Sequence, residues 1–427
     1  MHQNSTFKLS WKNSKADDTM EADYGRYLSS LYAGTSWSVT RLSGGLVNTT
    51  LRATQTSPVQ SNVPESVILK HAKPYVEVVG PEWVFSTKRQ EVEAIFLDLF
   101  SEHGSLSYLR QEPYWNSPRC LHHREGKESD LGLSSSDQEA SVLILSDLGN
   151  LVNIFDFLHQ QSYQPWDEVH PKIEKLAYDL GRIFAAIHSP ERVIRVQTSN
   201  PLAAAKLTHS LTRDIVRTAA IEPLQRRLAS TPNAEKLFAR VKEGFGAQEG
   251  AHPWSLAMGD LTQGSILMRD PSDDAEEEQD WTPTLVDWEF GQLNGRGVDG
   301  DLAQFLAHLH CELLSHPRTS ALRRAVSAFS LRFCAGYAER AGLRMRRRAD
   351  DETLRLMRWA FITHGREMVN QACESYKGNE RFDEIFRVGV WYLERAGDNV
   401  EDFVKEANWK ELEHEDGKML QSLFEVL

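Results

Sequence analysis

The stretch that decides the fold is Ala257-Met-Gly-Asp-Leu-Thr-Gln-Gly-Ser-Ile-Leu-Met268, followed after an acidic segment by Thr284-Leu-Val-Asp-Trp-Glu-Phe290. It contains two short apolar runs, residues 266–268 and 285–286, separated by a segment with almost nothing to bury. This pattern predicts two strands joined by a solvated loop. If the strands pair antiparallel, the beginning of the first and the end of the second lie at the same open end of the hairpin.

Four side chains with oxygen atoms would meet at that open end. Asp260 and Ser265 lie at the beginning of the first strand, and Asp287 and Glu289 lie at the end of the second. Carboxylates and a hydroxyl in this arrangement are typical of a divalent-metal and general-base site. The alternative is that these acidic residues belong to solvated turns, which is the usual situation for a single aspartate near a strand end.

The composition restricts the class of protein. A chain of 427 residues with 41% hydrophobic residues can bury a sizeable core and suits one two-lobed enzyme or two domains. Its formal net charge of −13 argues against nucleic acid as a partner, and the one basic run, residues 344–348, is typical of a solvated face. Four scattered cysteines, no secretory leader and no membrane-length apolar stretch predict a cytoplasmic protein with no membrane partner.

Residues 1–149 predict a small sheet lobe. After a polar and weakly helical extension, residues 1–36, two strand-like segments flank Gly44-Gly45. Glycines at a hairpin tip allow backbone N–H groups to approach an anion, but an ordinary hairpin also uses such a pair, and both interpretations stay open. A buried strand, residues 141–145, ends this lobe at Ser146-Asp-Leu-Gly149.

A third strand, residues 66–72, places Lys70 on a largely apolar face. Such a lysine either reaches solvent at a sheet edge or is held inward by a carboxylate to contact phosphate. Glu91 opens a helical pattern that continues through residues 94–99, so a helix packed on the sheet would direct Glu91 at Lys70. Glu93, two residues further on, points elsewhere unless the helix is turned differently.

Residues 150–427 predict a helical lobe that contains the catalytic loop and the substrate site. The clearest apolar stripe runs from Ile173 to Ile187 at three- and four-residue spacings, and His188 closes that helix in a position more typical of a structural histidine. Further helical patterns cover residues 207–228, 234–245, 302–314, 321–341, 353–373 and 382–393.

The order of these parts favours one reaction class. Phosphoryl transfer needs donors at the phosphates, a lysine fixed by a carboxylate, metal ligands, and a carboxylate that faces the acceptor hydroxyl. The chain presents a glycine turn, a lysine strand, a helix with Glu91, a helical lobe and a hairpin that ends in Asp-x-Glu, in that order. The combination is more specific than any one of these motifs.

These segments resemble successive blocks of the aminoglycoside phosphotransferase and choline kinase-like superfamily. The nearest likeness is to its methylthioribose kinase branch, which includes hydroxytryptamine kinase. The blocks are Leu42-Ser-Gly-Gly-Leu-Val-Asn48, Val67-Ile-Leu-Lys-His-Ala72, Leu143-Ile-Leu-Ser-Asp-Leu-Gly149, Gly259-Asp-Leu-Thr-Gln-Gly-Ser-Ile-Leu267 and Asp287-Trp-Glu-Phe290. The resemblance covers most of residues 37–391 and implies an α+β, bilobal protein-kinase-like fold with ATP between the lobes.

The resemblance also implies roles for individual residues. Asp260 is the catalytic carboxylate at the acceptor hydroxyl, and Lys70 and Glu91 are the ion pair that positions the phosphates. The implied magnesium ligands are Ser265, Asp287 and Glu289. The remaining implied nucleotide-binding residues are Ser43, Gly44, Gly45 and Asn48 in the glycine turn and Ser146, Asp147 and Leu148 beside the adenine. Either Asp299 or Asp301 is the structural acidic residue that follows the metal site.

The chain departs from the family pattern at two positions. The common loop begins with His-Gly-Asp and ends in Asn, whereas this chain has Met258 and Ser265. Ser265 still offers an oxygen as a neutral, weaker ligand, and Met258 leaves an apolar contact in place of a hydrogen-bonding ring. Support for the loop must then come from elsewhere, and the glycine turn is sparse beside that of protein kinases.

The sequence thus predicts an ATP-dependent kinase that transfers the γ-phosphoryl group to a hydroxyl of a small metabolite, with ATP and Mg²⁺ as cofactors. The C-terminal helices would bind the acceptor alcohol, and the acidic catalytic face favours an amine-bearing alcohol without identifying it. Two alternatives stay open: a catalytically inactive nucleotide-binding protein of the same fold, and a metal-dependent hydrolase that uses the same carboxylates.

Overall fold

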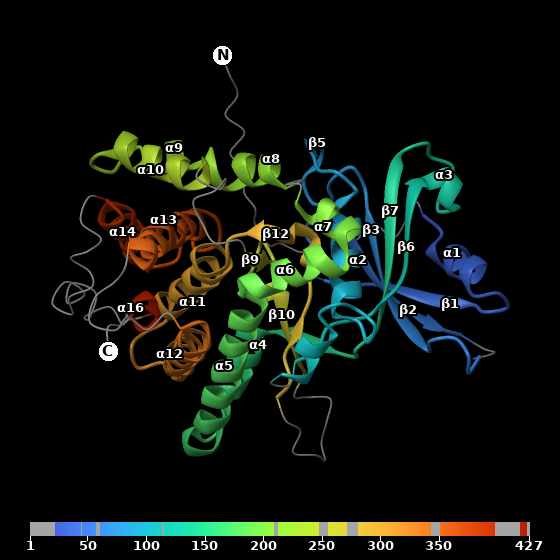
Figure 1. Ribbon diagram of the computed structural model, residues 1–427, viewed down its shortest axis with the longest axis horizontal. Coiled ribbons are helices and arrows are strands. Elements are labelled where there is room, and N and C mark those ends of the chain that lie inside the picture. Colours follow the sequence, from blue (N-terminus) through green and yellow to red (C-terminus); the bar gives the residue numbers. More distant parts are fainter. Residues whose placement is uncertain are drawn as a thin grey trace.

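The computed structural model describes most of the chain. The described residues are 22–43, 45–56, 60–112, 115–208, 212–246, 255–270, 281–342, 351–397 and 419–424. The fold is α+β, with an antiparallel sheet lobe on one side and a larger, mainly helical lobe on the other (Figure 1). The predicted two-lobed fold class is therefore confirmed, while the boundary between residues 149 and 150 stays a prediction.

The main sheet of the N-terminal lobe has five antiparallel strands in the order β1-β2-β3-β7-β6. They are β1 (Trp37–Arg41), β2 (Thr49–Gln55), β3 (Ser66–Ala72), β7 (Glu139–Ser146) and β6 (Cys120–Lys127). Lys70 lies opposite Thr50 on one side and Leu143 on the other. Because side chains alternate between the faces of a sheet, Lys70 shares its face with Ile68 and Leu143, and Leu69 points to the other face.

The two faces of this sheet pack against different helices. Helix α1 (Tyr24–Leu31), the weakly helical segment predicted before the sheet, joins Leu69 in a buried cluster on one face. Helix α2 (Arg89–Phe100) lies on the face of Lys70, and its Phe96 belongs to the core that continues into the C-terminal lobe. The sheet therefore presents Lys70 to a helix that also contacts the other lobe.

The predicted hairpin is confirmed, and its role in metal binding stays a prediction. Strand β10 (Ile266–Arg269) pairs antiparallel with β11 (Thr284–Leu285), and Ile266 lies opposite Leu285. The other short strands are β4 (Tyr75–Val76), β5 (Gly80–Val84), β8 (Leu151–Asn153), β9 (Ser255–Ala257) and β12 (Gln292–Gly295). Strand β8 joins the free edge of β10, and β9 pairs with β12, so the chain on both sides of the hairpin is tied to neighbours. The acidic loop expected at residues 273–280 lies outside the described residues.

Helices make up most of the C-terminal lobe. They are α4 (Ile154–Gln161), α5 (Trp166–His188), α6 (Pro190–Ser199), α7 (Pro201–Thr208), α8 (Arg213–Val216), α9 (Leu224–Arg227), α10 (Ala234–Gly246), α11 (Ala303–Ser315), α12 (Ala321–Ala341), α13 (Asp351–Glu374), α14 (Phe382–Arg395) and α16 (Met419–Leu423); α3 (Glu128–Leu131) is a single turn in the sheet lobe. Helices α5 and α12 pack closely because Gly181 and Gly336 lack a Cβ. A Cβ on either glycine would lie 2.1 Å from a carbonyl oxygen of the opposite helix.

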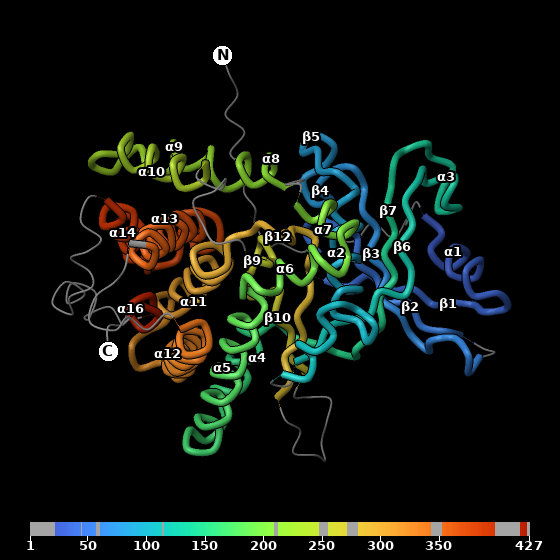
Figure 2. The backbone as a smooth tube through the Cα atoms, in the orientation of Figure 1, coloured from blue at the N-terminus to red at the C-terminus, as the bar shows by residue number. Residues whose placement is uncertain are grey.

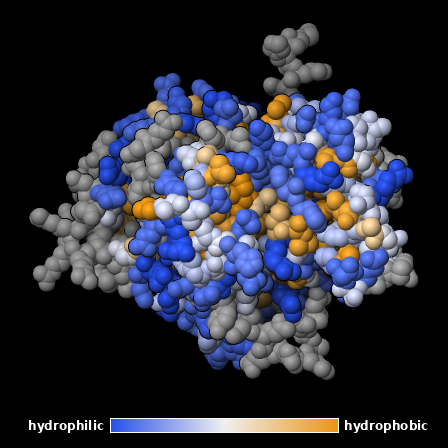
Figure 3. Space-filling view, turned by 45° about the vertical axis from the view of Figure 1, so that its right-hand side comes forward, coloured by the Kyte–Doolittle hydropathy of each residue, from blue (hydrophilic) through white to orange (hydrophobic). Residues whose placement is uncertain are grey.

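Among the described residues, no helix is both long enough and apolar enough to cross a membrane. On the face shown in Figure 3, hydrophobic residues form separate patches among hydrophilic ones, which is ordinary for a folded protein surface.

Candidate active site

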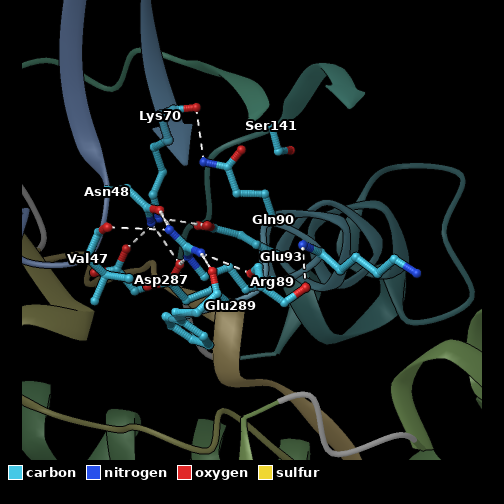
Figure 4. A network of polar contacts seen from close by, with 12 residues as sticks. Val47, Asn48, Lys70, Arg89, Gln90, Glu93, Ser141, Asp287 and Glu289 are labelled. Carbon is cyan, nitrogen blue, oxygen red and sulfur yellow. Dashed lines mark hydrogen bonds and ion pairs between the residues drawn. The ribbon is translucent and has the colours of Figure 1, made fainter. Parts of the chain in front are cut away.

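Lys70 is the centre of a buried ionic network between the lobes (Figure 4). Its Nζ lies 2.6 Å from Oε2 of Glu93 on α2 and 2.8 Å from Oδ1 of Asp287 at the end of the hairpin. Burial lowers the pKa of an ammonium, but Asp287 and Glu93 outweigh that effect and hold the pKa of Lys70 well above its usual value. Lys70 is therefore a charged group held inward by carboxylates from both lobes.

The pairing predicted for Glu91 is wrong. Glu91 forms an ion pair with Lys206 on α7, and Glu93 is the partner of Lys70. The physical reason is the rotation of the helix. Glu93 lies three residues before the buried Phe96 and shares its face. Glu91 lies two residues before Glu93, which places it about 200° away around the helix axis. Glu91 therefore faces the C-terminal lobe instead of the sheet.

Three carboxylates surround the Lys70 ammonium. Burial raises the pKa of Glu93, the charge of Lys70 opposes that shift, and the negative charges of Asp287 and Glu289 add to it. Burial therefore disfavours the ionised form of Glu93, and the Lys70 ammonium 2.6 Å away favours it.

A second buried network joins the glycine turn to the hairpin. Asn48 donates from Nδ2 to Oε2 of Glu289 over 2.7 Å, and its Oδ1 accepts from Arg89 Nη2 over 2.9 Å. The fully buried Arg89 guanidinium also lies 3.5 Å from Glu289 Oε2 and donates to the carbonyl oxygens of Phe85 and Lys73. Glu289 is thus committed to Asn48 and Arg89, and its role as a metal ligand stays a prediction.

Asp287 adopts a strained backbone conformation. Its φ of 62° and ψ of 55° lie in the left-handed region, which costs a non-glycine residue about 1–3 kcal/mol. The next residue, Trp288, is fully buried and stacks on Phe96 of α2 with the ring centroids 5.1 Å apart. The buried ring anchors the turn, and 51% of the Asp287 side chain is exposed. Strain of this kind is common at functional sites.

Asp260 lies in the predicted catalytic loop, residues 258–265, directly after β9. Its Oδ1 accepts a hydrogen bond of 2.5 Å from Gln304 Nε2 on α11. Burial raises the pKa of Asp260 to about 6; Gln304 opposes the shift, and the negative charge of Glu367 adds to it. Such a carboxylate is a stronger proton acceptor than an ordinary aspartate and is still ionised at neutral pH.

Asp301 accepts hydrogen bonds from two backbone N–H groups of the loop that contains Asp260. Its Oδ2 accepts the N–H of Met258 over 2.6 Å, and its Oδ1 accepts the N–H of Gly259 over 2.9 Å. His188 places Nε2 3.3 Å from the same carboxylate and Nδ1 3.0 Å from the Tyr337 hydroxyl, so it is a structural histidine. Asp301 is therefore the structural acidic residue that the sequence left undecided, and it supports the loop through the main chain of Met258.

Asp299 has a different role. Its Oδ2 accepts from Arg296 Nε over 2.8 Å, and Arg296 also donates to the carbonyl oxygen of Gly244 on α10 over 2.9 Å. Asp299 thus takes part in the packing of α10 against the turn before α11.

Ser265, at the end of the loop, uses its hydroxyl within the loop. Its Oγ donates to the carbonyl oxygen of Asp260 and accepts the N–H of Thr262, each over 3.2 Å. Its own carbonyl oxygen accepts the N–H of Val286 over 3.0 Å, which ties the loop to the chain just before Asp287. The hydroxyl stabilises the loop, and its role as a metal ligand stays a prediction.

The connection between the lobes adjoins a pocket of about 590 Å³. The described residues that line it are Asn116, Asp147, Leu148, Gly149, Leu151, Arg269, Thr282 and Thr284, and none of them belongs to the Lys70 network. Asp147 forms an ion pair of 2.8 Å with Arg52 of β2, and Ser146 Oγ accepts the N–H of Arg119 over 2.8 Å. Asp147 and Leu148 therefore line a pocket beside the Lys70 network, whereas the Ser146 hydroxyl is bound to the backbone of Arg119.

The glycine turn is described in part. Gly44 lies outside the described residues, and Ser43 is exposed. Gly45 packs so closely that a Cβ would lie 2.7 Å from the carbonyl oxygen of Asn48. Phosphate binding by this turn stays a prediction.

Asp287 is the residue best suited to a divalent metal ion. Within the described part of the chain, no group of three His, Cys, Asp or Glu side chains is arranged to hold a metal by itself. Proteins bind Mg²⁺ through one or two carboxylates, with phosphate oxygens and water as the other ligands. One half-exposed carboxylate beside a buried ammonium fits Mg²⁺ bound together with a nucleotide.

Sequence analysis missed Arg89 and Gln304, and it named Glu93 only as the alternative to Glu91. The signal for Arg89 and Glu93 was present, because both continue the spacing of Phe96 and Phe100 along one face of α2. Gln304 carried no such signal, since its partner lies 44 residues away in the sequence.

Comparison with known proteins gives similarity of fold only. Neither a protein-family profile nor a curated protein sequence matches the chain. Among solved structures, it is similar to a Ralstonia eutropha protein classed as a candidate aminoglycoside phosphotransferase, with 12% identity, a TM-score of 0.47, and coverage of 89% of this chain and 99% of that chain. It is also similar to an ethanolamine kinase of Plasmodium vivax, with 10% identity, a TM-score of 0.38, and coverage of 85% and 82%.

A third similar structure is a glucosamine kinase in complex with glucosamine, ADP and inorganic phosphate. The identity is 10% and the TM-score 0.40, with 87% of this chain and 82% of that chain covered. At such low identities and TM-scores, these similarities assign neither an activity nor a branch of the superfamily to the chain, and the methylthioribose kinase branch stays a prediction.

Proposed function

We propose that this chain is an ATP-dependent kinase that transfers the γ-phosphoryl group of ATP to a hydroxyl group of a small metabolite. One observation supports this most strongly: the Lys70 ammonium lies between Glu93 on a helix of the sheet lobe and Asp287 on the hairpin, at 2.6 and 2.8 Å. Phosphoryl transfer depends on a fixed cation and a metal-binding carboxylate placed together beside the phosphates.

In this proposal, Lys70 binds phosphate oxygens of ATP and Glu93 keeps its ammonium in place. Asp287 would hold Mg²⁺, with Ser265 and Glu289 as further candidate ligands; the ion supplies positive charge at the phosphate oxygens. The other nucleotide-binding residues that we propose are Ser43, Gly44, Gly45, Asn48, Ser146, Asp147 and Leu148.

Asp260 acts on the acceptor. Its carboxylate accepts the proton of the acceptor hydroxyl while the alcohol oxygen bonds to the γ-phosphorus and the bond from that phosphorus to the bridging oxygen of ADP breaks. Gln304 orients the carboxylate through Oδ1, and Asp301 fixes the loop through two backbone N–H groups. The products are ADP and a phosphate ester.

The acceptor would bind between Asp260 and the C-terminal helices. His308 Nε2 lies 3.3 Å from Oε1 of Glu367, and Arg366 Nη2 lies 3.7 Å from its Oε2. Burial alone would raise the pKa of Glu367, but His308 and Arg366 lower it to about 2, so this carboxylate is ionised. These polar side chains, which act electrostatically on Asp260, support a polar acceptor. Because Glu367 is already paired with His308 and Arg366, the proposal of an amine-bearing alcohol rests on the acidic catalytic face.

The test is a screen of ADP release from Mg-ATP over amino alcohols, thiosugars, hydroxylated indoles and aminoglycosides. With the right acceptor, Asp260→Asn should lower kcat by about 10²–10⁴-fold, because the amide keeps the shape but cannot take the proton. The matched control is Asp214→Asn, whose carboxylate is 85% exposed on α8 and should leave kcat unchanged. Full activity of Asp260→Asn would remove Asp260 from the role of base.

A nucleotide-binding protein without catalysis is the second candidate, and Met258 and Ser265 at the two ends of the loop favour it. Calorimetry that shows ATP binding, together with no turnover on any acceptor of the panel, would support that candidate. Binding of Mn²⁺ or Mg²⁺ without any ATP binding would instead favour a metal-dependent hydrolase.

A further inference from the structure

Helices α6 and α7 form a bridge between the lobes, and the proposed reaction does not explain them. They follow α5 and lie between α5 and α2 (Figures 1 and 2). We call residues 190–208 the α6–α7 bridge. Its charged side chains reach the N-terminal lobe, and its backbone packs on the strands of the catalytic loop.

On its C-terminal-lobe side, the bridge contacts the two strands that frame the active-site residues. Helix α6 packs on β9, which leads directly into the loop of Asp260, and α7 packs on β12, which follows the turn of Asp287. Arg192 Nε donates to the carbonyl oxygen of Ala186 over 3.2 Å and ties the bridge to α5. The bridge is therefore firmly attached to the part of the C-terminal lobe that positions both carboxylates.

On its N-terminal-lobe side, the bridge holds α2 and the turn that follows it. Arg195 Nε donates to the carbonyl oxygen of Ser105 over 2.7 Å, and its guanidinium lies 4.5 Å from the centroid of the Tyr108 ring. At the other end of α2, Lys206 Nζ is paired with Glu91 Oε1. The bridge thus holds the first turn of α2 and the chain that begins five residues beyond its last residue.

The two glutamates of α2 bind lysines on different sides. Glu93 pairs with Lys70 of the sheet, and Glu91, about 200° away around the helix axis, pairs with Lys206 of the bridge. Two ion pairs on nearly opposite sides restrain the rotation of α2 about its own axis. A rotation of α2 that lengthened the Lys206–Glu91 pair would also withdraw Glu93 from the Lys70 ammonium.

We propose that the α6–α7 bridge sets the rotation of α2, and that Lys206 and Glu91 are positioning residues for the Lys70–Glu93 pair. The consequence for nucleotide binding rests on the proposed kinase function, whereas the restraint on α2 depends on the contacts alone. The effect is moderate, because Phe96 stacks on Trp288 and gives α2 a second anchor. The side chains of Lys206 and Glu91 are 56% and 28% exposed, so both positions accept substitution without loss of the fold.

The experiment uses Lys206→Glu, Glu91→Lys and the double variant, in which the charges are exchanged. Lys377→Glu on an exposed turn after α13 is the charge-matched control. Hydrogen–deuterium exchange of a peptide that spans residues 89–100 should be about fivefold faster in either single variant and return to the wild-type rate in the double variant, because an exposed pair contributes up to about 1 kcal/mol. The control should not change this exchange.

The affinity for a fluorescent ATP analogue with Mg²⁺ is measured on the same proteins. It should weaken about fivefold in each single variant and recover in the double variant. Unchanged exchange in Lys206→Glu, or no recovery in the double variant, would overturn the proposal that the bridge sets the rotation of α2. Faster exchange with unchanged affinity would overturn the positioning role. A wild-type protein that does not bind the analogue would overturn the kinase function and leave the exchange result to decide on the bridge.

Discussion

The two halves of the candidate site are held together in different ways. In the nucleotide half, side chains hold side chains: the Lys70 ammonium depends on Glu93 and Asp287 for both of its short contacts. In the catalytic half, a side chain holds the backbone, because Asp301 accepts the N–H groups of Met258 and of the next residue. The nucleotide half therefore depends on the chemical identity of all three residues, whereas position 258 in the catalytic half needs only the right main-chain conformation.

This difference explains how the loop tolerates Met258. In the superfamily that the sequence resembles, a histidine stands at this position, whereas Met258 is fully buried in apolar surroundings. The carboxylate of Asp301 supplies the support that the ring would give, and His188 and Tyr337 extend that support into α5 and α12. Loss of the histidine therefore leaves the loop of Asp260 in place.

Removal of Asp301 should have the largest effect. In Asp301→Ala, two buried backbone N–H groups and His188 lose their acceptor, which should lower the free energy of unfolding by about 3–5 kcal/mol and abolish turnover. Urea unfolding measures the loss against Asp214→Ala, an exposed position that should change stability by less than about 0.5 kcal/mol. Equal stability of the two variants would show that the loop does not depend on this carboxylate.

The nucleotide half is tested by a pair of matched substitutions on one helix. Glu93→Gln removes a buried charge partner of Lys70 and should lower kcat/KM for ATP by about 100-fold, which corresponds to about 3 kcal/mol. Glu91→Gln removes an exposed partner of Lys206 and should cost about fivefold at most. The same steady-state assay reads both variants, and a larger loss in Glu91→Gln would reverse the assignment of the two glutamates.

The sequence predicted the parts of the site that depend on local patterns. The hairpin of β10 and β11 followed from two apolar runs and a polar loop, and its register brings the predicted residues to one end. Lys70 was placed on the correct face of β3 by the alternation of apolar residues. One extended helical pattern, residues 207–228, was too long: the structure has short segments there, and Pro223 within the pattern was a signal for the break.

The rest of the site depends on contacts that no local pattern encodes. Asn48 and Glu289 are 241 residues apart, and Arg89 contacts both of them. Arg89 lies at the start of α2, and the rotation of that helix decides which glutamate meets Lys70. An error of two residues in that rotation exchanged Glu91 for Glu93. The choice between two nearby aspartates behind the catalytic loop also required the tertiary structure.

A buried histidine on β3 makes the stability of the fold sensitive to acid. His71 Nδ1 lies 2.9 Å from the Tyr24 hydroxyl, and burial, with the charge of Lys73, lowers the pKa of His71 to about 4. The unfolded chain has the ordinary pKa of about 6.5 and binds the proton first, so this contribution to stability is complete above pH of about 6.5 and is lost as the pH falls toward 4. The full loss is about 3 kcal/mol.

The measurement is the free energy of unfolding from about pH 8 to pH 4 for the wild-type protein and for His71→Gln, which cannot titrate. The difference in free energy of unfolding between the wild-type protein and His71→Gln should shrink or change sign as the pH falls, because only the wild-type protein carries the titrating imidazole. Parallel curves would show that His71 is not held neutral in the fold. Asp214→Ala, at an exposed position on α8, should keep the wild-type pH dependence over this interval, since it leaves the surroundings of His71 intact.

The smallest effect is expected at Met258, although it departs most clearly from the pattern of the superfamily that the sequence resembles. Met258→Leu preserves the N–H that donates to Asp301 over 2.6 Å and nearly preserves the apolar volume. It should therefore cost less than about 1.5 kcal/mol of stability and leave kcat within about twofold of the wild-type value. A loss as large as that of Asp301→Ala would mean that the thioether itself supports the loop, and the contrast between a half held through side chains and a half held through the backbone would fail.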